Sequence, residues 1–234
     1  MSNKYKTVSI VIPVYNEEKT ILQILKKVLR ADTLGLKKEV IVVNDGSTDG
    51  TGEILKRYGK DIVLLKHRLN QGKGKALRTG FAKAKGEIIL VQDADLEYDP
   101  TDYPMMLTPF LTQGAKAVFG SRELAENTRS HPLFFAGGKI VTFTTRVLFG
   151  GRLTDVPTGY KAVLAKVLKK QRLKCVQFEF CPELAAKLLQ NKVRIVEVPI
   201  RYTPRKIQEG KKIGWLDGLT AIVTLIKIRL GTWK

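Results

Sequence analysis

The chain has 234 residues, enough for one large domain or two small ones. Its 41 Lys and Arg against 22 Asp and Glu give a formal net charge of +19, which predicts anionic partners such as nucleic acid, phosphorylated small molecules or an anionic membrane surface. Two cysteines exclude a disulfide framework and favour a reducing compartment. No signal-peptide pattern precedes the first strand and no segment resembles a spanning helix, so we expect a soluble or peripheral protein.

Buried strands alternate with helices over the first half of the chain. Nearly continuous apolar runs predict strands at residues 7–16, 38–45, 61–67, 86–92 and 115–121. Helical spacing of apolar residues, capping residues and a glycine-rich entry predict helices at residues 17–30, 47–59, 72–85 and 101–114. This alternation predicts an α/β fold with a doubly wound, mostly parallel sheet, whose ligands bind beyond the carboxyl ends of the strands.

The second half of the chain is less regular. Residues 131–151 are apolar and aromatic, with interrupting glycines and single basic residues. The pattern then predicts a strand running into a helix at 159–167, a short helix at 181–192, a strand at 193–205 and an amphipathic helix at 217–234. Because no linker separates the halves, we expect one domain over residues 1–234.

Two carboxylates stand at the end of the strand predicted for residues 86–92. Asp93 and Asp95 are two residues apart, so on an extended backbone both side chains point the same way. They repel each other unless a cation lies between them or one is protonated. Oxygen ligands suit Mg²⁺ or Mn²⁺, and the pair therefore predicts a metal–diphosphate site. The alternative is a solvated acidic turn.

The segment "NQGKGKALRTG" at residues 70–80 offers basic side chains, including Lys75, and backbone amides at a helix N-terminus. Phosphate groups bind at such termini. Its glycine spacing differs from that of a P-loop, and a helix start with solvated lysines is the alternative.

Several motifs together resemble the family-two glycosyltransferases, which have the GT-A fold. They are "VIPVYNEE", "VVNDGSTDGT", "NQGKGKALRTGFAKAKGEIILVQDADL", "GSRE" and "DVPTGYKAV". Within that family the chain most resembles the polyprenyl-phosphate (dolichyl-phosphate) mannose or glucose synthases, whose basic loop is similar to "VEVPIRYTPRKIQEGKKIGW". The Gln-x-x-Arg-Trp motif of processive synthases is absent.

The resemblance implies a role for individual residues. Those that would bind the nucleotide sugar are Pro13, Tyr15, Asn16, Glu17, Asp45, Lys75 and Asp93. The metal ligands would be Asp93 and Asp95, with Glu97 as either a third ligand or a turn residue. Arg122 would bind the acceptor, whereas Arg129 is either a second acceptor contact or a solvated loop arginine. Catalysis would involve Asp95, Arg205, Lys211 (or Lys212) and Glu179, the last as a base or as a contact to the sugar.

The implied reaction is an inverting, metal-dependent transfer of a hexose from UDP-glucose or GDP-mannose to a polyprenyl or dolichyl phosphate. Residues 1–122 would bind the nucleotide sugar and residues 123–234 the acceptor. A family-two enzyme with a soluble or protein-bound sugar acceptor is the first alternative, and a nucleic-acid-binding module is a remote one. A nucleotidyltransferase of the same broad fold lacks support because its glycine-rich signature is missing.

Two segments suggest how the chain reaches a lipid. Residues 132–151 and the C-terminal helix combine aliphatic and aromatic residues with a few basic ones, which is typical of helices in the membrane interface. The alternative is that both pack on the sheet. We expect a cytoplasmic protein attached peripherally to the cytosolic face of a membrane, either directly or through a membrane-protein partner.

Overall fold

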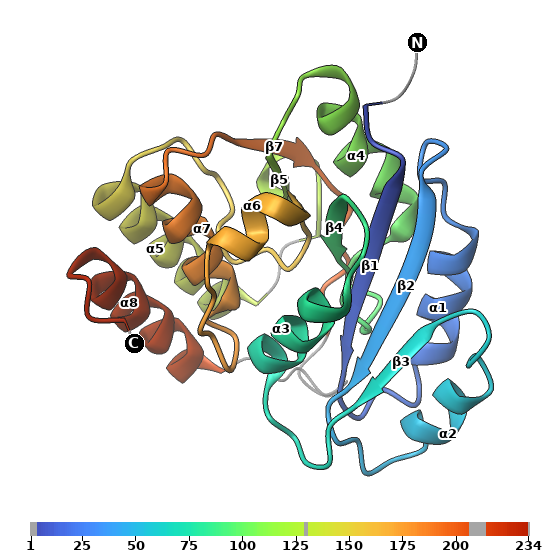
Figure 1. Cartoon of the computed structure of the whole chain (residues 1–234). Helices are drawn as coiled ribbons and strands as arrows, with labels where there is room; N and C mark the ends of the chain where they lie inside the picture. The colour runs from blue at the N-terminus through green and yellow to red at the C-terminus, as the bar shows by residue number, and fades with distance from the viewer. Residues whose placement is uncertain (1–3, 129–130, 206–213, 234) are drawn as a thin grey trace.

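The computed structural model describes residues 4–128, 131–205 and 214–233, except for the side chain of Trp215. Within these residues, seven strands form one sheet in the order β3-β2-β1-β4-β6-β5-β7 (Figure 1). The strands are β1 (Thr7–Val14), β2 (Lys37–Asn44), β3 (Val63–Lys66), β4 (Ile88–Val91), β5 (Ala117–Ser121), β6 (Lys161–Leu164) and β7 (Ile195–Pro199). The sheet therefore joins both halves of the sequence.

Most strand pairs are parallel, as the alternation of strands and helices predicts. β1 pairs in parallel with β2 and β4, β2 with β3, and β5 with β7. The exception is β6, which lies between β4 and β5 and is antiparallel to both. The carboxyl ends of β1, β2 and β4 consequently meet at one edge, where polar segments follow each strand.

Helices cover both faces of the sheet. One face carries α1 (Ile21–Arg30), α2 (Thr51–Lys56) and α4 (Tyr103–Thr112), and the other carries α3 (Lys73–Lys83), α6 (Ala165–Lys170) and α7 (Phe180–Gln190). Strand β1 serves both cores, because Ile10 and Ile12 point to one face and Val11 to the other. The fold is thus a GT-A-like α/β sheet with helices on both sides.

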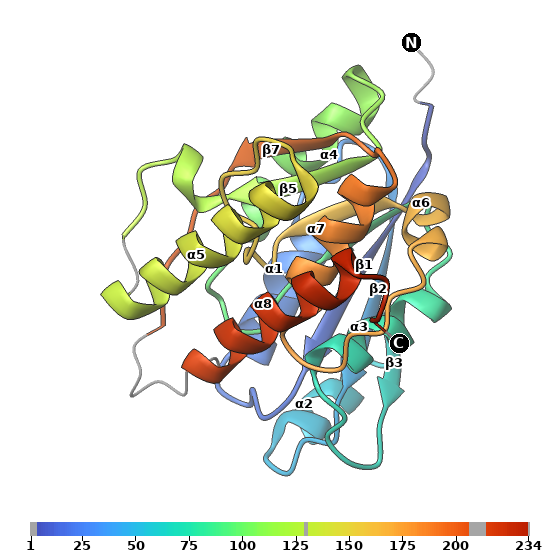
Figure 2. The same cartoon turned by 90° about the vertical axis from the view of Figure 1, so that its left-hand side faces the viewer.

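Two further helices form an outer layer on α7. They are α5 (Pro132–Phe149) and α8 (Trp215–Arg229), which lie side by side in Figure 2 and contact each other as well as α7. The amphipathic helix expected at the C-terminus is therefore present, although it packs on helices rather than directly on the sheet. Among the described residues, no helix is long and apolar enough to cross a membrane.

Two helices begin later than the sequence pattern predicts. α1 starts at Ile21 rather than Glu17, and α2 at Thr51 rather than Ser47. The reason is a set of contacts between the two preceding loops: the Ser47 hydroxyl accepts a hydrogen bond from Asn16 N, and the Thr51 hydroxyl accepts one from Glu17 N. These loops hold each other at the edge of the sheet instead of extending the helices.

Candidate active site

A large cavity of about 510 Å³ opens at the carboxyl ends of the central strands. Its lining includes residues that follow the strands and residues of α5 and α8. The predicted site residues that line this cavity are Pro13, Tyr15, Glu17, Asp45, Asp93, Asp95, Glu97, Arg122 and Arg205. Residues from five segments of the sequence thus meet in one place.

Asp93 and Asp95 lie just after β4 and line the cavity. The Asp93 carboxylate is buried, with 8% of the residue exposed, and Nζ of Lys73 lies 2.7 Å from its Oδ1. Gly159 makes room for this carboxylate, because a Cβ at that position would lie 2.3 Å from Asp93 Oδ2. The glycine of the "PTGY" motif is therefore part of the construction of the acidic site.

The acidic pair has the character of a cation site. Burial, together with the charges of Asp93 and Glu97, raises the pKa of Asp95 to about 7. The positive charge nearby does not balance the two carboxylates, and their oxygen atoms are ligands that suit Mg²⁺ or Mn²⁺. Magnesium typically takes one or two carboxylates and completes its shell with water and substrate phosphates, so this pair is sufficient.

Glu97 does not complete a three-carboxylate site. No cluster of three or more Asp, Glu, His or Cys side chains within residues 4–128, 131–205 and 214–233 is arranged to hold a metal ion. Glu97 Oε1 instead accepts a hydrogen bond from the backbone N–H of Arg205, at 2.8 Å. This arrangement favours the interpretation of Glu97 as a residue that positions the chain around Arg205.

The residues expected at the nucleotide lie around the ends of β1 and β2. Asn16 adopts a positive φ of 49°, and its side chain exchanges hydrogen bonds with Thr48, which ties the first loop to the second. The Asp45 carboxylate is almost fully buried and accepts hydrogen bonds from Gln71 N and Gly72 N at 3.0 and 2.8 Å. Asp45 thereby shapes the entry to α3 while lining the cavity.

Among the described residues, the lysine that lines the cavity is Lys73, which was not a candidate from the sequence. Lys75 is not among the residues that line it. Two of the backbone amides at the expected phosphate site are already bonded, because Gly74 N and Lys75 N donate to the carbonyls of Gln177 and Val176 at 3.0 Å each. A segment about 100 residues away along the chain therefore occupies the start of α3.

Arg205 lies beside the acidic pair and contacts both Glu17 and the backbone of Asp95. Its guanidinium Nη1 donates to Glu17 Oε1 at 3.1 Å, Nη2 contacts Glu17 Oε2, and Nε donates to the Asp95 carbonyl at 3.0 Å. Glu17, three residues after β1, and Arg205, beyond β7, are 188 residues apart. The ion pair holds the start of the predicted basic loop beside the carboxylates. Lys211 and Lys212 lie outside the described residues, as does Arg129.

Arg122 is positioned by a buried partner, Asp155, which the sequence analysis did not identify. Its Nε and Nη2 donate to the two Asp155 carboxylate oxygens at 2.7 Å each, and its backbone N donates to Oδ2 at 3.0 Å. Glu197 on β7 in turn accepts hydrogen bonds from Thr154 N and Asp155 N. The guanidinium also lies 4.9 Å from the centre of the Tyr202 ring. Arg122 thus has a fixed orientation at the cavity.

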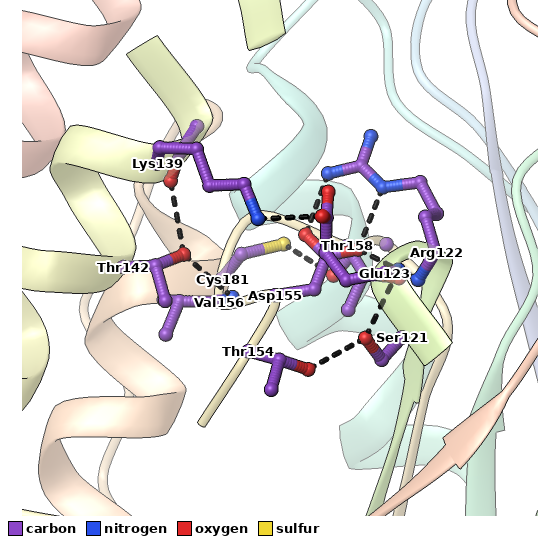
Figure 3. A network of polar contacts seen from close by, with 12 residues as sticks. Ser121, Arg122, Glu123, Lys139, Thr142, Thr154, Asp155, Val156, Thr158 and Cys181 are labelled. Atoms are coloured by element: carbon purple, nitrogen blue, oxygen red, sulfur yellow. Dashed lines mark hydrogen bonds and ion pairs between the residues drawn. The ribbon is translucent and has the colours of Figure 1, made fainter. Parts of the chain in front are cut away.

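Figure 3 shows how this arginine is joined to α5 through a network of polar contacts. Lys139 on α5 forms an ion pair with Glu123, the neighbour of Arg122. The Thr142 hydroxyl accepts a hydrogen bond from Val156 N at 3.1 Å. The segment that carries Asp155 therefore contacts both the end of β5 and α5, which links the position of the arginine to that of the helix.

Glu179 lies just before α7 and is not among the residues that line the cavity. Its carboxylate accepts hydrogen bonds from Val176 N and Gln177 N, so it stabilises the turn that contacts the start of α3. Glu183 is fully buried and accepts hydrogen bonds from Lys174 N and Cys175 N. These positions favour a structural role for Glu179 over the role of a catalytic base, and Glu183 has a structural role as well.

Comparison with known proteins agrees with this geometry. Residues 9–171 match the family described as Glycosyl transferase family 2. The chain is 32% identical to an uncharacterised protein of Methanocaldococcus jannaschii, over 93% of the chain and 90% of that protein. It is 28% identical to UDP-N-acetylglucosamine–dolichyl-phosphate N-acetylglucosaminyltransferase of Methanococcus voltae, over 97% of both. It is 29% identical to a dolichyl-phosphate beta-glucosyltransferase of Trichomonas vaginalis, over 97% of the chain and 75% of that enzyme.

Among solved structures, the fold is similar to that of glucosyl-3-phosphoglycerate synthase from Mycobacterium tuberculosis in complex with Mn²⁺, UDP and glucosyl-3-phosphoglycerate. The TM-score is 0.73 and the identity 21%, over 97% of the chain and 80% of that protein. This likeness supports the fold, whereas the match over residues 9–171 identifies the family. The chain belongs to glycosyl transferase family 2 and is a glycosyltransferase.

Proposed function

We propose that this enzyme transfers a hexose, with inversion, from a UDP- or GDP-sugar to a polyprenyl or dolichyl phosphate at a membrane surface. The observation that carries the proposal is the composition of the cavity wall. The lining combines the charged residues Asp93, Asp95, Arg122 and Arg205 with apolar residues of α5 and α8, namely Leu133, Phe134, Val141 and Ala221. A cavity of this kind suits an acceptor with an anionic head and a hydrocarbon tail.

The outer surfaces of α5 and α8 support a membrane location. On α5 the exposed apolar residues are Leu133, Ile140, Phe143 and Val147, and on α8 they are Leu216, Leu219, Val223 and Ile226, with Leu230 directly after the helix. The spacing of three and four residues places each set on one side of its helix. Ala221, Leu225 and Ile228 form the buried side of α8. The two helices therefore combine a packed inner face with an apolar outer face, as interfacial helices do.

The relatives support a lipid phosphate as the acceptor. Two of them, aligned over 97% of this chain, are named as enzymes that act on dolichyl phosphate. A phosphate monoester already carries at least one negative charge at pH 7, since its second pKa is about 6. It attacks the anomeric carbon without a strong general base, which agrees with the structural roles of Glu179 and Glu183.

In this proposal the side chains of the cavity bind the donor and the acceptor, orient them and neutralise their negative charge. Asp93 and Asp95 would hold Mg²⁺ or Mn²⁺, which when bound neutralises charge on the donor diphosphate. Arg122, held rigidly by Asp155, would bind the acceptor phosphate. Arg205 would contact the leaving diphosphate, where charge develops during transfer. Tyr15 and Asp45 at the strand ends would contact the nucleoside.

A transfer assay tests the chemistry. The protein is incubated with UDP- and GDP-sugars, labelled in the sugar, together with Mn²⁺ or Mg²⁺ and a polyprenyl phosphate. We expect label in the organic phase with one donor, and no label when EDTA replaces the metal. Transfer to soluble sugars but not to the lipid would instead support the alternative acceptor class. A thermal-shift panel of the same nucleotides identifies the donor, since a ligand that binds the folded state raises Tm.

A flotation assay tests the membrane location. Wild-type protein should float with anionic liposomes at low salt, and the paired variant Phe143→Asp and Val147→Asp should not. Both side chains are 66% exposed and neither lines the cavity, so the charges should disturb neither the core nor the site. Leu22→Asp is the matched control, because Leu22 is exposed on α1, on the opposite face of the sheet. Wild-type protein that never floats, even with polyprenyl phosphate present, would argue for a partner that supplies the anchor.

A further inference from the structure

At the start of α3, Gly72 and Gly74 pack closely against residues 176 and 177, and this packing places Lys73, which lies between the two glycines, in the cavity. A Cβ on Gly72 would lie 2.4 Å from the Val176 carbonyl oxygen, and one on Gly74 would lie 2.8 Å from the Gln177 carbonyl oxygen. Only glycine fits at either position, and Gly72 also has a positive φ of 93°. Lys73, between them, is the residue of this turn whose side chain projects beside the acidic pair.

The Lys73 ammonium occupies the place beside Asp93 that a divalent cation would take. Its Nζ contacts Asp93 Oδ1 at 2.7 Å, with 20% and 10% of the two side chains exposed. The same carboxylate is the first of the two that fit Mg²⁺ or Mn²⁺. An ammonium group and a divalent cation cannot share this oxygen closely, because like charges repel strongly in a partly buried site.

The surroundings also favour a second anion for Lys73. A lysine in the first turn of a helix faces the positive end of the helix dipole, so its charge is placed at an electrostatic cost unless an anion compensates it. The backbone amides of Gly74 and Lys75 are already bonded to carbonyl groups, so neither can bind a phosphate without losing that bond, whereas the Lys73 side chain reaches the cavity. The four-carbon stem of lysine allows the ammonium to move without a change in the backbone.

We propose that Lys73 is a tethered cation of the donor site: it neutralises Asp93 in the donor-free protein, and it passes to the donor diphosphate when a divalent ion takes its place. This inference rests on the proposed nucleotide-sugar site. It has a thermodynamic consequence: metal binding alone must displace the ammonium, whereas a nucleotide diphosphate accepts it. Metal and nucleotide therefore strengthen each other's binding through Lys73, and by the same factor in both directions.

The test measures Mn²⁺ affinity from the electron paramagnetic resonance signal of free Mn²⁺, with and without UDP or GDP. Lys73→Met should raise the affinity of the nucleotide-free protein for Mn²⁺ by at least about tenfold, or about 1.4 kcal/mol. The increase in Mn²⁺ affinity caused by the nucleotide should shrink by a similar factor. Lys73→Arg, which keeps the charge, should behave like wild type in the absence of nucleotide. Lys83→Met, in the exposed last turn of the same helix, is the control.

A second readout needs no nucleotide. In EDTA, Lys73→Met should have a lower Tm than wild type, because it leaves the buried Asp93 carboxylate without its cation, and Mn²⁺ should restore the loss. If Lys73→Met does not fold, Lys73→Gln replaces it. An unchanged or lower Mn²⁺ affinity in the uncharged variants would overturn the assignment of Lys73. A wild-type protein that binds neither UDP nor GDP would overturn the proposed function and the diphosphate step, while the nucleotide-free comparison still decides the pairing of Lys73 with Asp93.

Discussion

Replacing Asp155 by alanine should destabilise the protein by about 3 kcal/mol. The carboxylate is 3% exposed and accepts three hydrogen bonds from Arg122, at 2.7, 2.7 and 3.0 Å. Breaking a buried ion pair from one side costs about 3–5 kcal/mol, because the remaining charge stays buried without a partner. We expect the lower end, since 23% of the Arg122 side chain is exposed and gains some hydration. For a chain of this size, Tm should fall by about 6–12 °C.

Equilibrium unfolding in guanidinium chloride measures the loss, with Asp102→Ala as the matched control. Asp102 is equally buried and accepts hydrogen bonds from Arg201 N and Nε at 2.7 and 3.0 Å, but 68% of the Arg201 side chain is exposed. Water can therefore solvate Arg201 when its partner is removed, and we expect a loss below about 2 kcal/mol. Equal losses in the two variants, or a loss below about 1 kcal/mol for Asp155→Ala, would refute the reasoning.

The same ion pair should be visible in the pH dependence of stability. Burial alone would raise the pKa of Asp155, but the hydrogen bonds and charge of Arg122 lower it below its ordinary value. In acid the unfolded chain then binds more protons at this residue than the folded protein does. The contribution of Asp155 is therefore complete above about pH 4 and is lost as the pH falls through the lower pKa of the folded state. Asp155→Ala should lack this part of the acid dependence.

Three further predictions concern the cavity. Because the pKa of Asp95 is raised to about 7, the metal-free folded protein binds more protons there than the unfolded chain, and its stability should fall as the pH rises from about 4 to above 7. Asp95→Asn should remove this fall in EDTA and should abolish metal-dependent transfer; an unchanged pH profile would contradict the assignment. Arg205→Ala should lower kcat more than it weakens donor binding, if Arg205 stabilises charge that develops on the leaving group. A change in donor affinity alone would make Arg205 a binding residue. Glu17→Gln should weaken the ion pair with Arg205. A double-mutant cycle with Arg205→Ala, measured on the free energy of unfolding, should give an interaction energy of about 0.5–3 kcal/mol.

Much of the first half of the fold follows from local sequence patterns. The apolar runs ending at Val14, Asn44 and Val91 are strands in the structure, because continuous β-branched segments of this length suit a sheet covered on both faces. The carboxyl ends of such strands meet at one edge, so the proximity of Tyr15, Asp45 and Asp93 also follows from the sequence. The antiparallel direction of β6 does not, because strand direction depends on how the chain returns to the sheet.

The partners of the charged residues depend on contacts between distant segments. The motif "GKGK" suggested Lys75 as the residue that contacts the nucleotide sugar. In the structure Lys73 reaches the cavity instead, because residues 175–177 pack against the two glycines and set the rotation of the first helical turn. The same holds for Asp155, whose motif marks a family but not its contact with Arg122, 33 residues earlier. A carboxylate directly preceding "VPTGY" was the available signal, since a buried acid needs a cationic partner.

The sequence by itself therefore determined the family, the alternating α/β order and the acidic pair at the end of β4, because these are encoded in short runs of residue types. Only the tertiary structure decided which cation faces which carboxylate: Lys73 with Asp93, Arg205 with Glu17 and Arg122 with Asp155. It also decided that α8 has one side buried against α5 and α7 and an apolar side exposed. The physical reason is that charge pairing and burial depend on distances in space, and residues separated by 20 to 188 positions approach each other only after the sheet has formed.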